Sequence, residues 1–191
     1  MGTIIGIDEV GRGCWAGPLL IVAARQVAEL PSGLVDSKLL SRKQRERLMD
    51  DISLACELGE GWVQPAEIDD MGLTAAMRLG VARALAAVDA GYNEAIIMDG
   101  NFNYCDTDFT EVRAVIKADA SYPIVSAASI HAKVRRDNYM ASLGEPYRKY
   151  EFAKHVGYGT KLHHDLLRLH GVSDQHRLSF KQVHVVKAAL A

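Results

Sequence analysis

GIDEVGRGCWAGPLLIVAA, residues 6–24, predicts two strands joined by a glycine-rich turn. The β-branched and apolar residues of 3–8 and 18–27 are typical of buried strands. Two adjacent acids, Asp8 and Glu9, follow the first strand, and three glycines come soon after them. Adjacent acids at the end of a predicted buried strand make this stretch a candidate for a functional site as well as a signal for the fold.

The rest of the chain predicts an alternation of helices and short strands. The spacing of apolar residues predicts helices over 42–56, 72–90, 124–142, 160–170 and 183–190. Further strands are predicted over 58–64, 94–98 and 112–116, the last two of them buried. With no internal repeat or linker, these elements favour a single α/β domain over 1–191, with a mixed sheet flanked by helices. The part from about 145 to 191 is expected to be helical.

Composition places the chain among globular proteins, with 49% hydrophobic and 24% charged residues. The longest apolar run, Leu19–Ala24, is too short to cross a bilayer, and the first residues do not have the pattern of a secretion signal. Three cysteines without a CxxC pair favour reduced thiols. We therefore expect a cytoplasmic protein without a membrane partner.

Charge is distributed unevenly along the chain. Residues 1–120 hold 19 acidic against 11 basic side chains, whereas 121–191 hold 5 acidic against 11 basic ones and all seven histidines. A basic last third beside an acidic remainder suits an enzyme that binds both metal ions and a polyanion. An ordinary solvated surface is the alternative interpretation.

Four acids share one placement, because each follows a predicted strand: Asp8, Glu9, Asp99 and Asp119. Strand ends in an open α/β sheet converge on one crevice, where four carboxylates repel one another unless cations neutralise them. Mg²⁺ or Mn²⁺ suits such oxygen ligands. Two such ions about 4 Å apart activate water and stabilise the leaving oxygen of a phosphodiester. For each acid taken singly, a helix cap or a turn is the alternative.

Six blocks of the sequence resemble the ribonuclease HII family and occur in the family's order, from residue 6 to about 180. They are GIDEVGRGCWAGP, DSKLLS, IMDGN, KADASYPIVSAASIHAKVRRD, HVGYGTKLH and HRLSF. The resemblance implies a ribonuclease H-like fold and hydrolysis of the RNA strand of RNA/DNA hybrids. It also implies cleavage on the 5′ side of a single ribonucleotide in duplex DNA, leaving 3′-hydroxyl and 5′-phosphate ends.

The same resemblance implies roles for the acids and for the glycine-rich turn. The four acids would be catalytic and would bind two Mg²⁺ or Mn²⁺ ions. Gly11, Arg12 and Gly13 would recognise the 2′-hydroxyl, since glycines let the backbone approach a sugar closely and this hydroxyl distinguishes RNA from DNA. A plain turn between strands is the alternative for this loop.

Five further residues are candidates for contact with the nucleic acid. The resemblance makes Lys38 a phosphate contact, although a surface lysine is the alternative. Ser129, Lys133 and Asp137 recur every four residues on a predicted helix; they would order phosphates and water, or Lys133 would pair with Asp137 in solvent. Tyr158 lies between two glycines and would stack on a sugar or base, with a core position as the alternative.

The histidines of the last third do not have the spacing of a zinc site, and no cysteine accompanies them. We interpret them as surface or hydrogen-bonding residues, with His163, His176 and the adjacent Arg177 facing nucleic acid. The expected partners are RNA/DNA hybrids and DNA duplexes that contain ribonucleotides, bound by a monomer.

Three other functions are alternatives to the one that this resemblance implies. Another nuclease or integrase on the same fold would share the acids, but would have no need of a loop that reads a 2′-hydroxyl. Ribonuclease HIII resembles the sequence less, because it has Lys in place of Arg12. A non-catalytic module that binds hybrids would be expected to lack one of the four acids, and all four are present.

Overall fold

The strands β1 (Ile4–Val10) and β2 (Leu19–Gln26) form an antiparallel pair in the computed structural model, which describes residues 4–34 and 40–189. The sheet has five strands in the order β3-β2-β1-β4-β5. The remaining strands are β3 (Cys56–Val63), β4 (Ala95–Asp99) and β5 (Val112–Val115). Strand β4 runs parallel to both of its neighbours, so the sheet is mixed, as the sequence predicts.

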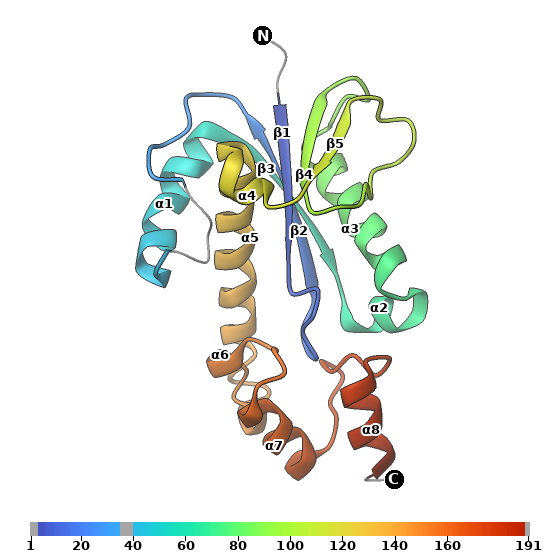
Figure 1. Cartoon of the computed structure of the whole chain (residues 1–191). Helices are drawn as coiled ribbons and strands as arrows, with labels where there is room; N and C mark the ends of the chain where they lie inside the picture. The colour runs from blue at the N-terminus through green and yellow to red at the C-terminus, as the bar shows by residue number, and fades with distance from the viewer. Residues whose placement is uncertain (1–3, 35–39, 190–191) are drawn as a thin grey trace. The chain divides into compact units, whose positions relative to one another are not determined.

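The helices follow the predicted order for the most part. They are α1 (Arg42–Ala55), α2 (Pro65–Met71), α3 (Leu73–Ala87), α4 (Ala118–Ser121), α5 (Pro123–Ser142), α6 (Phe152–His155), α7 (Lys161–His170) and α8 (Lys181–Ala189), with a 3₁₀ turn η2 (Arg148–Tyr150) (Figure 1). Side chains cap the first turns of several helices. For example, Ser41 and Gln44 form a capping box at α1, and the Thr160 hydroxyl accepts from the first turn of α7. Among the described residues, no helix is long and apolar enough to span a membrane.

The chain divides into two compact units. The second unit comprises Gly11–Leu19, Val63–Ala76 and Arg135–Ala191, and so contains the turn after β1, helix α2 and the helices that follow α5. The first unit contains the rest: almost the whole sheet, α1, α4, most of α3 and the larger part of α5.

Helices cover both faces of the sheet in the first unit. Leu20 and Val22 of β2 belong to an apolar cluster with residues of α1 and α5. Ile21 points the other way, toward α3, where a Cβ added to Gly80 would lie 2.2 Å from its Cδ1 atom. Figure 1 shows α1 and α5 on one side of the sheet and α3 on the other. Because both faces of the sheet are covered, the side chains of β2 are buried on either side, which explains why the strand is apolar from Leu19 to Ala24.

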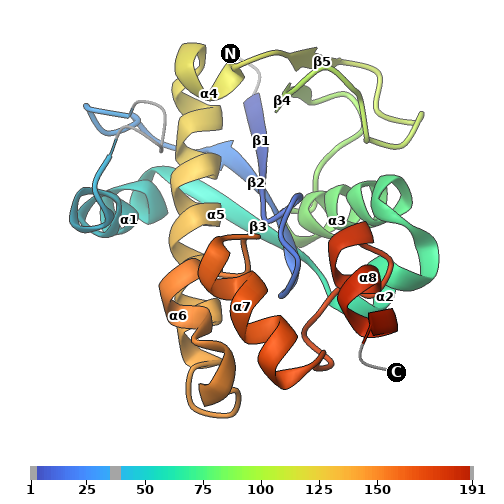
Figure 2. The same cartoon turned by 60° about the horizontal axis from the view of Figure 1, so that its bottom comes forward.

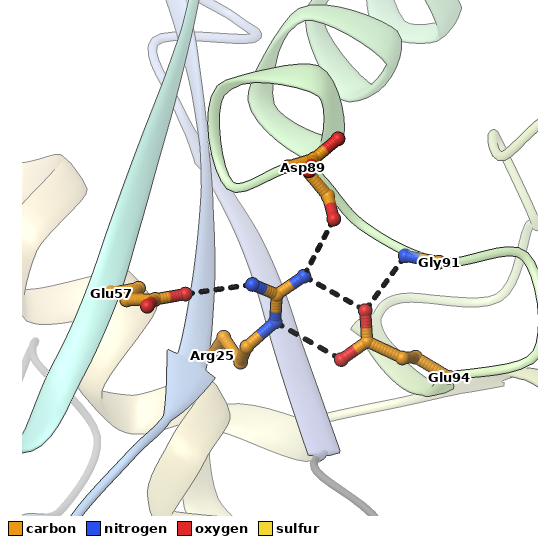
Figure 3. Close-up of polar contacts among 5 residues, drawn as sticks. All are labelled: Arg25, Glu57, Asp89, Gly91 and Glu94. Carbon is orange, nitrogen blue, oxygen red and sulfur yellow. Dashed lines mark hydrogen bonds and ion pairs between the residues drawn. The ribbon is translucent and has the colours of Figure 1, made fainter.

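Arg25, near the end of β2, ties three parts of the first unit together (Figure 3). Its guanidinium donates to Glu94 through Nε and Nη2, at 3.0 and 2.8 Å, and to Glu57 of β3 at 2.7 Å. Nη2 also donates to the carbonyl of Asp89. Partial burial lowers the pKa of Arg25, but the bonds to Glu94 and Glu57 outweigh it and raise the pKa above its usual value. Arg25 therefore stays charged and fixes the turn that leads into β4.

Replacing Arg25 with methionine is expected to destabilise the first unit by about 2–3 kcal/mol, because Glu94 loses a two-bond partner while it remains largely shielded from water. Urea unfolding measures the loss. Arg42→Met is the matched control, since the Arg42–Glu46 pair lies in solvent on α1 and is expected to contribute less than about 0.5 kcal/mol. Equal effects of the two substitutions would contradict the role assigned to Arg25.

The structure corrects three expectations about these elements. The helix predicted over 72–90 is shorter, and α2 before it was not predicted because Pro65 was taken as a stop rather than as the first residue of a helix. Strand β5 is not buried, and Ile116 beyond it is 71% exposed. Asp8 and Glu9 lie within β1 rather than after it, since pairing with β2 continues to Val10.

The second unit has its own apolar clusters. Met140 at the end of α5 packs with Tyr150 and Phe152, and α7 packs on α8 through Leu167 and Val183. Helix α7 also contacts η2 and α6, and Figure 2 shows α6 beside α7. This helical part of the chain agrees with the expectation for residues beyond about 145.

Candidate active site

Three of the four predicted acids come together in the first unit. Asp8 and Glu9 are on β1, and Asp99 is the last residue of the neighbouring strand β4. Asp8 is 7% exposed, and the hydroxyl of Ser129, on α5, donates to its carboxylate. The parallel pairing of β1 with β4 thus gathers carboxylates at one edge of the sheet, as the strand-end argument predicts.

Burial changes the acidity of Asp8. Desolvation, together with the charges of Glu9 and Asp99, raises its pKa to about 8, although the hydrogen bond from Ser129 opposes this shift. At neutral pH the carboxyl group therefore holds a proton unless a cation lies nearby. A carboxyl group with such a shift is characteristic of functional sites.

Asp119 lies on a short helix that follows β5, rather than at the end of β5 itself. It lies in the first turn of α4 and is 3% exposed. Lys117 at the start of α4 has a left-handed backbone, with φ of 60°, which turns the chain from β5 into the helix. The Asp99 carboxylate accepts from the backbone N–H of Ala118 at 2.7 Å, so Asp99 contacts the helix that carries Asp119.

The donor set suits a hard divalent cation. All four side chains offer oxygen ligands, the kind that Mg²⁺ and Mn²⁺ prefer. Within residues 4–34 and 40–189, no three His, Cys, Asp or Glu side chains are grouped closely enough to hold a metal ion as they stand. A cation would relieve both the burial of Asp8 and its repulsion from Glu9 and Asp99, provided that the side chains turn toward it.

The glycine-rich turn lies in the second unit, where two buried arginines hold its carbonyl groups. Arg136 donates to the carbonyls of Pro18, Ala16 and Val156 at 2.8–3.1 Å. Arg177 donates twice to Gly17 and once to Arg12. Both guanidinium groups are fully buried, and burial lowers the pKa of Arg177 to about 10, which keeps it charged at neutral pH.

The glycines of this turn differ in what surrounds them. Gly11 has φ of 88°, and a Cβ there would lie 2.2 Å from Nε of Arg136, so no larger residue fits. A Cβ on Gly13 would meet nothing within 4 Å, and both Arg12 and Gly13 are exposed. The backbone at Gly13 is therefore accessible to a molecule from outside.

Tyr158 lies beside the same turn. Its ring is 40% exposed, and its hydroxyl is within hydrogen-bonding distance of Cys14. A Cβ on Gly157 would lie 2.1 Å from the carbonyl oxygen of Ala16, and one on Gly159 would lie 2.3 Å from the ring of Trp15. The two glycines thus let the chain pack closely on the turn.

The remaining predicted contacts lie on α5 or outside the described residues. Ser129 contacts Asp8, and Lys133 is half-buried one turn later on α5. Asp137, also half-buried, belongs to the second unit. Lys38 lies outside the residues that the structure describes.

Sequence reasoning missed the role of Arg136 and misplaced that of Arg177. Arg136 follows Ala132 and precedes Met140 at four-residue spacing, both of them fully buried. An arginine in the middle of such an apolar row was the available signal. The expectation that His163, His176 and Arg177 face nucleic acid is wrong, because all three are at most 1% exposed, but the two histidines do form hydrogen bonds.

Comparison with known proteins gives a consistent result. The family model described as Ribonuclease HII matches residues 5–183. A ribonuclease HII of Streptomyces avermitilis is 42% identical over 180 residues, which cover 93% of this chain and 76% of the relative.

Solved structures of similar fold agree with the sequence comparison. Ribonuclease HII from Archaeoglobus fulgidus, solved in complex with PCNA, aligns with a TM-score of 0.79 and 26% sequence identity. The alignment covers 94% of this chain and 95% of the Archaeoglobus chain. Bst-RNase HIII in complex with Mn²⁺ has a TM-score of 0.70 and 20% identity, with 98% of this chain and 70% of its own covered, and shows likeness of fold alone.

Proposed function

The chain belongs to the ribonuclease HII family of endoribonucleases, and on this premise we propose that it hydrolyses the RNA strand of RNA/DNA hybrids and also cuts on the 5′ side of single ribonucleotides in duplex DNA. The products would carry 3′-hydroxyl and 5′-phosphate ends. The observation that carries the proposal is the grouping of buried Asp8 with Glu9 and Asp99 at the adjacent ends of β1 and β4.

We propose that Asp8, Glu9, Asp99 and Asp119 hold two Mg²⁺ or Mn²⁺ ions, which would supply an activated water and stabilise the leaving oxygen. The chain's own part is to place the carboxylates. Ser129 orients Asp8 by its hydrogen bond, and the N–H of Ala118 orients Asp99. The Mn²⁺ bound to Bst-RNase HIII supports the choice of ion.

Substrate selection is assigned to the second unit. The exposed backbone of Arg12 and Gly13 would contact the 2′-hydroxyl, which both donates and accepts hydrogen bonds. Tyr158, half-exposed beside that turn, would stack on the deoxyribose next to the ribonucleotide. Lys38, Lys133 and Asp137 would contact or order phosphates. The helical part from about 145 to 191 would thus contribute to substrate binding within one catalytic domain. We further propose that the protein acts as a monomer in the cytoplasm.

A cleavage assay tests this function. The substrates are a duplex with one ribonucleotide, a long RNA/DNA hybrid and an all-DNA duplex of the same sequence, each with Mg²⁺, Mn²⁺ or EDTA. We expect cuts in the first two only, on the 5′ side of the single ribonucleotide, and none in EDTA. Cleavage of the all-DNA duplex would favour another nuclease of the same fold, and binding without cleavage would favour a hybrid-binding module.

Tyr158→Ala is expected to lower kcat/KM by an amount equal to about 1–3 kcal/mol, the range for one lost stacking contact. The loss should be greater on a single ribonucleotide than on a long hybrid, where other registers are available. Tyr158→Phe keeps the ring and should keep most of the activity. Steady-state kinetics on both substrates measures this. Equal damage to both substrates, or equal damage by Phe and Ala, would contradict the stacking role.

A further inference from the structure

Three histidines of the second unit form a buried cluster that the proposed chemistry does not use. His155 of α6, His163 of α7 and His176, before α8, are at most 5% exposed. The rings of His155 and His163 are stacked, with centroids 4.2 Å apart and an interplanar angle of 16°. The Nε2 atoms of His163 and His176 are 3.2 Å apart. Each ring therefore meets another ionisable ring instead of water.

The partners of His163 fix which of its nitrogens carries hydrogen. Its Nδ1 lies 3.0 Å from the carbonyl oxygen of Tyr158, which can only accept, so Nδ1 is the donor. In a neutral ring the other nitrogen then has a lone pair. This Nε2 faces the Nε2 of His176, which must therefore donate to it.

The partners of His176 require the same direction independently. The backbone N–H of Ser173 donates to Nδ1 of His176 at 3.0 Å, and the Ser173 hydroxyl lies 2.9 Å from the same atom. Nδ1 is thus an acceptor and Nε2 a donor. One chain of hydrogen bonds runs from Ser173 through both rings to the carbonyl of Tyr158.

His155 is fixed in the same way. Its Nε2 lies 2.8 Å from the carbonyl of Tyr150 and must donate, while its Nδ1 accepts from the N–H of Gly157 at 3.2 Å. A second proton on any of the three rings would place an N–H against another N–H donor. The geometry therefore allows only neutral rings, each in one tautomer.

Two of the three rings bind the segment that carries Tyr158. His163 binds the carbonyl of Tyr158, and His155 binds the amide of Gly157. The carbonyl of Gly157 in turn accepts from the N–H groups of Trp15 and Ala16, in the glycine-rich turn. We propose that His155, His163 and His176 are positioning residues whose neutral network fixes the Gly157–Tyr158 backbone for substrate binding, and that protonation of the network releases it. The functional part of this inference rests on the role proposed for Tyr158.

Charges around the cluster give the direction of its response to pH. Burial, and after it repulsion among the rings, lowers the pKa of His163 to about 4 and that of His176 to about 3. Burial also lowers the pKa of His155. Two carboxylates oppose these shifts, Glu151 at His155 and Asp174 at His176. Tyr150 packs against His176. Beyond the three rings, His170 packs against Tyr150, and His164 packs against Trp15, the neighbour of His163.

These pKa values determine how the stability of the folded protein changes with pH. The unfolded histidines take up protons near their ordinary pKa of about 6.5, whereas the folded ones do so only at lower pH. The network's contribution to stability is therefore complete above about pH 6.5 and is lost as the pH falls toward the folded pKa values.

Nitrogen NMR of the full chain with ¹⁵N-labelled histidine tests the tautomers directly. We expect protonated Nδ1 in His163 and protonated Nε2 in His155 and His176. His163 and His176 should not titrate between about pH 8 and about pH 5, and the pKa of His155 should lie below its usual value. The exposed His184 of α8 supplies an internal reference signal from a ring outside the cluster. Protonated Nε2 in neutral His163, or ordinary titration of the three rings, would overturn the proposal. This measurement needs no substrate and so does not depend on the proposed function.

A matched pair of variants tests the positioning role. The side-chain amide of Asn reaches the place of Nδ1, so His163→Asn keeps the donor to Tyr158, whereas the longer amide of His163→Gln reaches the place of Nε2 and loses it. We expect His163→Gln to raise KM about tenfold, the effect of one lost hydrogen bond, with kcat changed less than about twofold. His163→Asn should restore KM to within about threefold, and His184→Asn should have no effect. Equal damage by Asn and Gln, or none by either, would overturn the role.

A double variant separates this inference from the role of Tyr158. If His163 acts through Tyr158, then His163→Gln combined with Tyr158→Ala should be no worse than Tyr158→Ala alone. Additive losses would overturn the positioning role while leaving the stacking role in place. A harmless Tyr158→Ala would instead refute the stacking role, and with it the functional part of this inference, whereas the tautomers stand or fall on the NMR result.

Discussion

Asp99→Asn and Asp8→Asn are each expected to lower kcat by about three orders of magnitude, equal to about 4 kcal/mol of transition-state stabilisation. The reason is charge rather than shape. Asparagine has nearly the size of aspartate, and a neutral side chain at position 8 matches the protonated state that burial favours there, so the fold should be preserved. What is lost is the negative charge that would hold the metal ions.

Binding and cleavage should respond differently to these substitutions. The acids repel the phosphates of the substrate, so a hybrid should bind the variants at least as tightly as it binds the unchanged protein. Single-turnover kinetics and fluorescence anisotropy measure the two quantities separately, and calorimetry with Mn²⁺ measures the loss of metal. Asp50→Asn, on the exposed surface of α1, is the matched control and should leave all three unchanged. Turnover near normal in Asp8→Asn or Asp99→Asn would refute the assignment.

Most of the features that the sequence could predict depend on residues that are neighbours along the chain. The hairpin of β1 and β2 follows from apolar runs on either side of a glycine-rich turn, and α1 follows from its capping box, because both signals lie within a few neighbouring residues. The grouping of acids was also accessible, since parallel strands bring their ends to one edge. Asp119 was harder, because the left-handed residue Lys117 separates it from β5 and it lies in the short helix α4 rather than at the end of a strand.

What the sequence could not predict depends on contacts between distant residues. Arg136 binds the carbonyl of Pro18 across 118 positions, and Arg177 binds Gly17 across 160. The apolar row around Arg136 indicates that it is buried but does not identify its partners, and Arg177 has no local pattern that distinguishes it from a surface cation. The histidine network was equally hidden, because the partner of His163 is a ring 13 positions away whose tautomer depends on Ser173. Spacing along a chain carries no information about such hydrogen bonds.

Arg177→Met is expected to lower the stability of the second unit by about 3 kcal/mol. Arg177 donates to the carbonyls of Gly17 and Arg12, and each buried carbonyl that loses its donor costs about 1–3 kcal/mol. Methionine fills much of the same space, so the loss reports the hydrogen bonds rather than a cavity. Arg177→Lys keeps the charge but lacks the planar fork that reaches both carbonyls, and should recover only part of the loss.

Urea unfolding measures this loss through the fluorescence of Trp15, which lies in the second unit, in a Trp62→Phe background that silences the tryptophan of the first. Arg168→Met is the matched control, because Arg168 is exposed on α7 and should contribute less than about 0.5 kcal/mol. The same variants link stability to function: since Arg177 holds the carbonyl of Arg12, its loss should also raise KM for the hybrid, and Arg168→Met should raise KM far less. Unfolding midpoints that coincide for Arg177→Met and Arg168→Met would show that the buried guanidinium does not hold the turn.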